Sequence, residues 1–395
     1  MKKMLAVILL IILLSSGCLS PVSLDAYGYV ISIGIGRGTE KKYYFTFALQ
    51  RELSEQNIDS EGGAVILSAE ADGIFEAVSE MEGNIPYSLN FSRTNFVILE
   101  RELAEEGVME DFVSTSFDAL KIRTSTVLIV SEGPAHEFIG GMYSNNEANI
   151  GKLQSALMLD REKTGTVTVM SISRLIEACS DGRYDYCTSY GKYDGSIITD
   201  AEQKKSESEG KNPLDEVKTG DRVGGLKSFV EGAAVFSGWK MTGVLDSEET
   251  MLLNIVTGDF ENGVLSLDRS DGSRVSVLLS RRKRDISADE NLGINVHIVL
   301  DAGVIKKDPD ITASETDAWL TEKLPEIIRE RLLELFLKLR GIESDAMRFG
   351  TALVKNFDST EAWESFETRA WLASLEPVFT VEIVNTEKYI GEDMQ

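Results

Sequence analysis

A chain of 395 residues with a formal net charge of −25 has room for two or three domains. Its 43% apolar and 27% charged residues are ordinary for a globular protein and argue against a wholly disordered chain. The 65 acidic against 40 basic residues argue against nucleic acid and against electrostatic adsorption to an anionic membrane, because both surfaces reward clustered Lys and Arg. Three cysteines are too few for a disulfide scaffold.

The first residues have the pattern of an export signal. Two lysines precede an unbroken apolar run from Met4 to Leu14, which is too short to span a bilayer but matches a secretory signal core. The small residues that follow end in Cys18, an order that resembles the bacterial lipoprotein signal, in which the cysteine is acylated. We expect residues 1–17 to be a signal peptide and Cys18 to carry a palmitate-type lipid anchor. An ordinary cleaved signal and an uncleaved anchor are the alternatives.

An N-terminal α+β domain is expected over residues 18–200. Segments rich in β-branched and aromatic residues over 29–35 and 43–49 flank a glycine-containing turn, which predicts a β-hairpin. The polar residues 50–63 predict a loop. Further strands are expected over 65–71, 95–99, 122–130 and 166–169. Helices are expected over 74–81, 101–107, 110–117, 134–140 and 172–179.

The composition changes between residues 181 and 225, where Gly, Ser and charged residues dominate. We expect a linker or long surface loop there, with 201–225 as the linker between domains. A β-pattern returns over 226–285, where Asn-Gly and Asp-Gly turns separate short apolar segments. This spacing predicts a small antiparallel β-rich domain, a meander with strands over 226–236, 240–245, 251–256, 264–267 and 274–279.

A C-terminal α+β domain with a long helix is expected over residues 286–395. Ser314 can cap a helix, and Pro325 either kinks that helix or begins a second one. Apolar residues from Ile328 to Leu339 recur at helical spacing and predict a buried face. The remaining segments expected are strands over 294–300 and 378–384 and an amphipathic stretch over 357–366. The whole chain is therefore predicted to be α+β, with three domains of mixed or antiparallel sheets flanked by helices.

A basic run, Arg281, Arg282, Lys283 and Arg284, stands out in this acidic chain. Charges on a solvated strand edge deter pairing with other chains, which is one explanation of the run. A contact with lipid phosphate or with an acidic partner is the other explanation. The sequence pattern alone leaves both open.

No residue pattern typical of catalysis or cofactor binding is found. Gly34, Gly36 and Gly38 lie between two predicted strands and do not open a helix, so they do not match a dinucleotide-binding loop. His136 and His297 fall in different predicted domains and have no neighbouring metal ligands. We expect no cofactor, no metal site and no enzymatic activity.

Cys179 and Cys187 remain once Cys18 is assigned to the lipid. Disulfides can form in an exported protein, and the Asp181-Gly182 pair between the two cysteines could fold them together. The alternative is two reduced, partly buried thiols.

Several short segments occur in an order that carries a family resemblance. They are Ile33–Ile35, Phe91–Arg93, Glu100–Gly107, Gly232–Phe236, Met241–Leu245, Glu248–Thr250, Lys338–Gly341, Ser344–Asp345, Phe349–Gly350, Trp363 and Trp371. With the lipoprotein signal they extend over nearly the whole mature chain. Together they resemble the spore germination C-subunit family, the Ger(x)C-type lipoproteins.

The resemblance implies a lipid-anchored, non-enzymatic C subunit of a nutrient germinant receptor, on the outer face of the spore's inner membrane. It also implies two integral-membrane partners, an A subunit and a transporter-like B subunit, and a fold of three α+β domains. A solute-binding lipoprotein of a transporter is the alternative, but it would need two βαβ lobes around a cleft. A tethered hydrolase is less consistent still, because no nucleophile–base motif is present.

Overall fold

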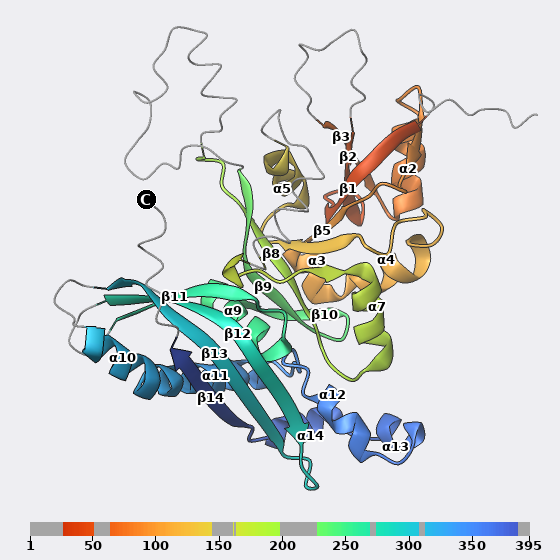
Figure 1. Ribbon diagram of the computed structural model, residues 1–395. Coiled ribbons are helices and arrows are strands. Elements are labelled where there is room, and N and C mark those ends of the chain that lie inside the picture. Colours follow the sequence, from red (N-terminus) through yellow and green to blue (C-terminus); the bar gives the residue numbers. More distant parts are fainter. Residues whose placement is uncertain are drawn as a thin grey trace, which may run out of the picture.

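The computed structural model describes residues 27–50, 64–143, 161, 163–197, 227–268, 274–307 and 313–385 (Figure 1). The predicted signal peptide, Cys18, residues 51–63 and the predicted linker 201–225 lie outside the described residues. Two β-sheets with helices packed against them make up the described part. The predicted α+β class with mixed sheets is therefore confirmed.

The larger sheet mixes parallel and antiparallel strands. Its strands are β1 (Tyr27–Arg37), β2 (Tyr43–Leu49), β3 (Val65–Ala71), β4 (Ser88–Asn90), β5 (Phe96–Glu100), β6 (Val127–Ser131), β7 (Met170–Ser171), β8 (Cys187–Tyr193), β9 (Ser228–Ser237) and β10 (Lys240–Leu245). The main path runs β10-β9-β8-β6-β5-β1-β2-β3, with β4 paired to β1 and β7 paired to β6. β1, β5, β6 and β8 are parallel neighbours in the middle of this path, and antiparallel hairpins flank them on both sides.

Helices cover both faces of the larger sheet. One face carries α2 (Ile74–Glu82), α3 (Arg101–Glu106), α4 (Val108–Ser116) and α7 (Ile172–Asp181) in one hydrophobic cluster. The opposite face carries α5 (Ala135–Met142) beside β1. A side chain on Gly34 would collide with Ile139 of α5, so the absence of a side chain there lets this helix approach the sheet. The predicted hairpin over β1 and β2 is confirmed.

The smaller sheet is formed by β11 (Asn262–Asp268), β12 (Arg274–Ala288), β13 (Ile294–Lys307) and β14 (Val378–Asn385), in that order. The first three strands are antiparallel, and β14 is parallel to β13. α10 (Ala313–Glu322) and α11 (Leu324–Gly341) both contact β14. The chain between α11 and β14 forms α12 (Gly350–Leu353), a 3₁₀ turn over Val354–Asn356, α13 (Thr360–Glu364) and α14 (Thr368–Ser374).

α9 (Ser247–Thr257) lies between the two sheets and contacts β9 on one side and β12 and β13 on the other. Asp246 and Glu249 form a capping box at its start, and Gly258 ends it in the left-handed conformation. Every residue from Thr250 to Val256 is buried. The strand predicted over 251–256 is therefore wrong. A helix buried on all sides lacks a polar face, and its sequence resembles that of a buried strand.

The antiparallel meander predicted over 226–285 is also wrong. β9 and β10 pair within the larger sheet, whereas β11 and β12 pair within the smaller one, and α9 separates the two hairpins. Gly238 lies in the turn between β9 and β10, whereas Asn262 and Gly263, which were predicted to form a turn, lie within β11. Local turn signals also carry no information about which distant strand each hairpin joins. In Figure 1 the larger sheet lies above the smaller one.

β8 lies inside the segment 181–225 that was predicted as a linker or long loop. Thr188 and Ser189 are polar yet fully buried in this strand, because their hydroxyls donate to the backbone oxygens of Leu128 and Thr168. A central strand of hydrogen-bonded polar residues does not show the apolar pattern that predicts strands.

Three smaller differences concern element boundaries. The strand predicted over 122–130 begins at Val127, and the one predicted over 166–169 reduces to a single bridge at Val167. Pro325 lies at the start of α11, so it begins a second helix and does not kink the first.

Candidate functional site

The two cysteines of the described chain are free thiols. Cys187 on β8 is buried in the cluster around α9, whereas Cys179 on α7 packs against the cluster on the opposite face of the larger sheet. Burial raises the pKa of Cys179 to about 12 and raises the pKa of Cys187 still more. Cys179 and Cys187 therefore lie on opposite faces of the larger sheet as two free thiols. They do not form the disulfide that the sequence left open.

The basic run on β12 does not form one uniform patch, although all four side chains are exposed. Arg281 donates to the Gly258 carbonyl and to Glu261, and a strand bulge follows it. Arg282 instead pairs with Asp301 of β13 at 3.0 Å. Arg284 lies with Arg281 beside Gly258, at the end of α9. The run is thus divided between the surface of the smaller sheet and the end of α9.

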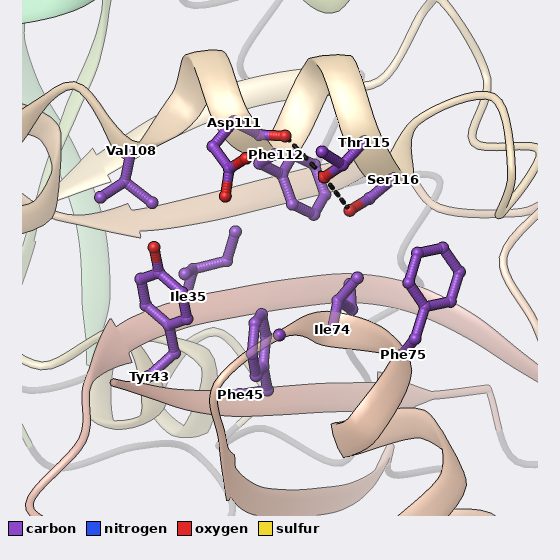
Figure 2. A pocket seen from close by; sticks show the side chains of 11 residues that line it. Ile35, Tyr43, Phe45, Ile74, Phe75, Val108, Asp111, Phe112, Thr115 and Ser116 are labelled. Carbon is purple, nitrogen blue, oxygen red and sulfur yellow. Dashed lines mark hydrogen bonds between the residues drawn. The ribbon is translucent and has the colours of Figure 1, made fainter. Parts of the chain in front are cut away.

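An apolar pocket of about 100 Å³ lies between α4 on one side and β1, β2 and the start of α2 on the other (Figure 2). The buried side chains Ile35, Tyr43, Phe45 and Ile74 line one side, and the buried Phe112 of α4 faces them. Phe75, at its mouth, is 50% exposed although it is a large apolar side chain. Polar atoms at the rim come from α4: Asp111, Thr115 and Ser116.

This pocket has the size of one small apolar group. Thr115 donates to the backbone oxygen of Asp111 and lies 3.0 Å from the Ser116 hydroxyl, so both hydroxyls are engaged within the helix. The lining holds no pair of nucleophile and general base. The geometry allows the pocket to receive an apolar side chain or ligand group, and it provides no catalytic arrangement.

A second hollow, of about 290 Å³, lies between the larger sheet and the start of α9 and is lined mainly by charged groups. Its charges are largely paired: Lys338 binds Glu249, Lys192 binds Glu231, and Arg101 binds Glu105 beside it. These pairs link α11 to α9 and β8 to β9. The hollow therefore serves as a polar seam between elements of the two sheets.

Two carboxylates, the buried Asp345 and the partly buried Asp185, join the halves of the molecule at the turn after α11. Asp345 accepts hydrogen bonds from the backbone N–H groups of Phe349 and Gly350 at 2.9 and 2.7 Å. Asp185, just before β8, accepts from the N–H groups of Asp345 and Gly238 at 2.9 and 2.7 Å. Burial raises the pKa of Asp345 to about 7 and also raises the pKa of Asp185.

The residues of this junction include part of the motif order that carried the family resemblance. Gly350 must lack a side chain, because a Cβ there would collide with the backbone oxygen of Arg183. Ser344 donates to the backbone oxygen of Phe236, at the end of β9. The Ser344–Asp345 and Phe349–Gly350 segments thus connect the smaller sheet's helices to the larger sheet. Asp185 was not singled out from the sequence, where it falls in the segment 181–225 that was expected to be a linker or long surface loop.

The two histidines lie on different elements, His297 on β13 and His136 on α5. His297 Nε2 is 3.0 Å from Glu382, across the parallel pair of β13 and β14, and His136 packs edge-on against Tyr44. Over the described ranges no three His, Cys, Asp or Glu side chains are grouped so that they could hold a metal ion. Among those same residues, no helix has the length and apolar character needed to cross a bilayer.

Two family profiles match the chain one after the other. The spore germination protein N-terminal domain matches residues 21–192, and the spore germination B3/GerAC-like C-terminal domain matches residues 231–386. The crystal structure of the GerBC protein superimposes with a TM-score of 0.52 at 14% identity, covering 89% of this chain and 96% of that one. At this identity the superposition shows a shared fold. No curated protein sequence matches the chain.

Proposed function

We propose that this chain, which belongs to the spore germination family with GerAC-like N- and C-terminal domains, is the C subunit of a germinant receptor. The subunit would act in nutrient-triggered germination, anchored by lipid on Cys18 to the extracytoplasmic face of the spore's inner membrane. Its partners would be the integral-membrane A and B subunits. It would work through contact with these partners and would not catalyse a reaction.

The observation that carries this proposal is the tandem order of the two family matches. The first match ends within β8 and the second begins within β9, so together they include strands of both sheets and the junction between them. The superposition on GerBC extends over 89% of the chain. This coverage supports a shared architecture along most of the chain, and not in one domain alone.

Contact as the mode of action is consistent with the described surface. A lipid anchor confines the folded body to a thin layer at the membrane, which raises its effective concentration near membrane partners without any new contact. The apolar pocket beside α4 and the basic run on β12 carry no catalytic pair. A solute-binding lipoprotein fits less well, because the smaller sheet is largely antiparallel and is not a second βαβ lobe.

The anchor is tested by Cys18→Ala. The variant should lose lipid labelling, and it should either be released from membranes or remain unprocessed, because acylation requires the thiol. Lipid labelling is the measurement, with partitioning between detergent and aqueous phases for any processed protein. Equal lipid labelling of the variant and the wild type would contradict the proposed lipid anchor.

The basic run is tested by changing Arg281, Arg282, Lys283 and Arg284 together to Gln or Ser. Exposed charge changes of this kind usually alter stability by less than about 0.5 kcal/mol each, so the body should stay folded. If the run is a partner contact, co-purification with the membrane subunits and the germination response should both fall. Unchanged co-purification would assign the run to a solvated strand edge.

A further inference from the structure

Five arginines from four separate segments meet at the end of α9. They surround Gly258 and Asp259. One comes from the segment before β7, one from α7, two from β12 and one from the turn after α11. We call them the arginine cluster: Arg161, Arg174, Arg281, Arg284 and Arg348. In a chain with a net charge of −25 this is an unusual local concentration of positive charge.

The carboxylates near the cluster do not satisfy it. Asp259 alone is shared by three of the arginines, with N···O distances of 3.2 Å to Arg348 and 3.9 Å to Arg161 and to Arg174. Ion pairs at 3.9 Å are too long for charge-assisted hydrogen bonds, which are usually about 2.7–2.9 Å. Among the described residues, Glu261 forms an ion pair with Arg281. The three arginines around Asp259 therefore retain unused donor groups.

Arg284 lies beside two other members of the cluster. Arg348 and Arg281 both face it with like charge, and Asp259 and Asp285 are the carboxylates that act on it. Burial and the two neighbouring guanidinium groups lower the pKa of Arg284. Asp259, Glu261 and Asp285 are the carboxylates near these groups, and the buried Asp345 lies close to Arg348. Five positive groups therefore face four carboxyl groups, and burial raises the pKa of one of them, Asp345.

Two buried donor atoms of the cluster also lack a hydrogen-bond acceptor among the described residues. Within the part of the chain that the structure describes, the Nε atoms of Arg161 and Arg348 are buried without a hydrogen-bond partner. A buried donor without an acceptor is destabilising, and such donors are usually satisfied by water, an ion or a ligand. The site is nevertheless open to solvent, because the side chain of Arg174 is 54% exposed.

We propose that the arginine cluster binds a phosphate-type oxyanion, either free in solution or as the phosphate of a lipid headgroup. The planar guanidinium fork matches phosphate oxygens, and a tetrahedral anion offers acceptors in several directions at once. Arginines that arrive from four segments suit such an anion better than a planar carboxylate, which one fork can satisfy. The site lies where α7 of the larger sheet's layer meets α9 and β12, so a bound anion would connect the two sheets. This inference does not depend on the subunit assignment.

The primary experiment is thermal unfolding of the full chain, purified in detergent, titrated with inorganic phosphate and compared with chloride at matched ionic strength. A ligand that binds only the folded state raises the unfolding temperature in a saturable way. We expect saturable stabilisation by phosphate beyond that of chloride. The same stabilisation by both salts would overturn the proposal, because it would reflect general screening.

Variants localise the site. Arg284→Gln and Arg348→Gln should each weaken phosphate binding about tenfold, the equivalent of about 1.4 kcal/mol. Arg282→Gln is the matched control, because Arg282 lies in the same basic run but pairs with Asp301. Equal weakening by Arg282→Gln would overturn the proposed site and would indicate a diffuse charge effect.

Asp259→Asn should strengthen phosphate binding, the opposite of the effect expected for the arginine variants. Removing this carboxylate frees the guanidinium groups of Arg348 and its neighbours, so phosphate should bind more tightly than to the wild type. Unchanged or weaker phosphate binding by a folded Asp259→Asn protein would show instead that the arginines serve only to hold Asp259.

The two sources of phosphate are separated by a vesicle assay with the same variants. If the anion is a headgroup phosphate, phosphatidylglycerol vesicles should bind the unacylated Cys18→Ala chain, and Arg284→Gln should reduce that binding while Arg282→Gln should not. If the anion is free, inorganic phosphate should bind saturably, and Arg284→Gln should leave vesicle binding of the Cys18→Ala chain unchanged. Failure of both probes would overturn the proposal, whatever the outcome for the receptor subunits.

Discussion

Asp345 and Asp259 lie near the same junction, on either side of Arg348, but they are held in opposite ways. Asp345 is buried and accepts two short hydrogen bonds from backbone N–H groups of its own turn. Asp259 is 19% exposed and is shared loosely by arginine side chains from distant segments. The first carboxylate fixes a turn, whereas the second leaves its partners free to take another anion. Similar residues at one junction can thus serve structure in one case and recognition in the other.

Asp345→Ala should show the largest effect. The N–H groups of Phe349 and Gly350 would lose their acceptor in a buried turn, which should lower the free energy of unfolding by about 3 kcal/mol. Asp289→Ala is the matched control, because Asp289 also accepts two backbone N–H groups but lies exposed in the β12–β13 turn. Denaturant titration is the measurement. Equal losses for the two variants would show that burial of the junction adds nothing.

The pH dependence of stability should be the next largest effect. Asp345 has a folded pKa of about 7, raised from about 3.8 by burial, so the folded state holds its proton more tightly than the unfolded state. This contribution is complete below pH about 4 and is lost as the pH rises through about 7, with a slope of at most about 1.4 kcal/mol per pH unit. Burial also raises the pKa of Asp185, so its contribution to stability changes with pH in the same direction.

The measurement is the free energy of unfolding at several pH values for the wild type and for Asp345→Asn. The variant cannot titrate at this position, so the difference between the two proteins isolates Asp345. We expect the wild type to lose stability relative to the variant between pH about 4 and about 7, with little further change above that range. A difference that stays constant with pH would mean that Asp345 is ionised throughout this range.

Asp259→Asn should have the smallest effect on stability. Partly exposed ion pairs contribute about 0–1 kcal/mol, and salt screens them, so the loss should stay below about 1 kcal/mol and shrink at high ionic strength. Unfolding in phosphate-free buffer at low and high salt is the measurement. A loss as large as that of Asp345→Ala would place Asp259 with the structural carboxylates.

The sequence predicted elements well where local pattern and burial agree. β1, β2 and β3 alternate or continue apolar residues as strands with one or two covered faces do, and α7 has the amphipathic spacing of a surface helix. Asp246 and Glu249 have the spacing of a capping box, a helix-start signal that the strand prediction over 251–256 did not use. Placement between two sheets removes the polar face on which helix prediction depends.

The sites were far less predictable than the elements. The junction of Asp185 with Asp345 joins residues 160 positions apart, and the arginine cluster extends from Arg161 to Arg348. Such groupings depend on how the sheets pair and pack, and no local spacing encodes that. The family resemblance did mark Ser344–Asp345 and Phe349–Gly350, but it gave no physical reason for them. The structure supplies one in the backbone hydrogen bonds and in the close approach of Arg183 to Gly350.

β1 lies in the interior of the larger sheet, parallel to β5 on one side and antiparallel to β2 on the other. A chain tethered ahead of Tyr27 would transmit any pull on the tether directly along this strand. Its interstrand hydrogen bonds would then be loaded in shear and would have to break together, and they could not open one after another from an edge. Under such a load the position of β1 would make the larger sheet resistant to mechanical unfolding from its N-terminal end, a property governed by the unfolding rate and not by equilibrium stability.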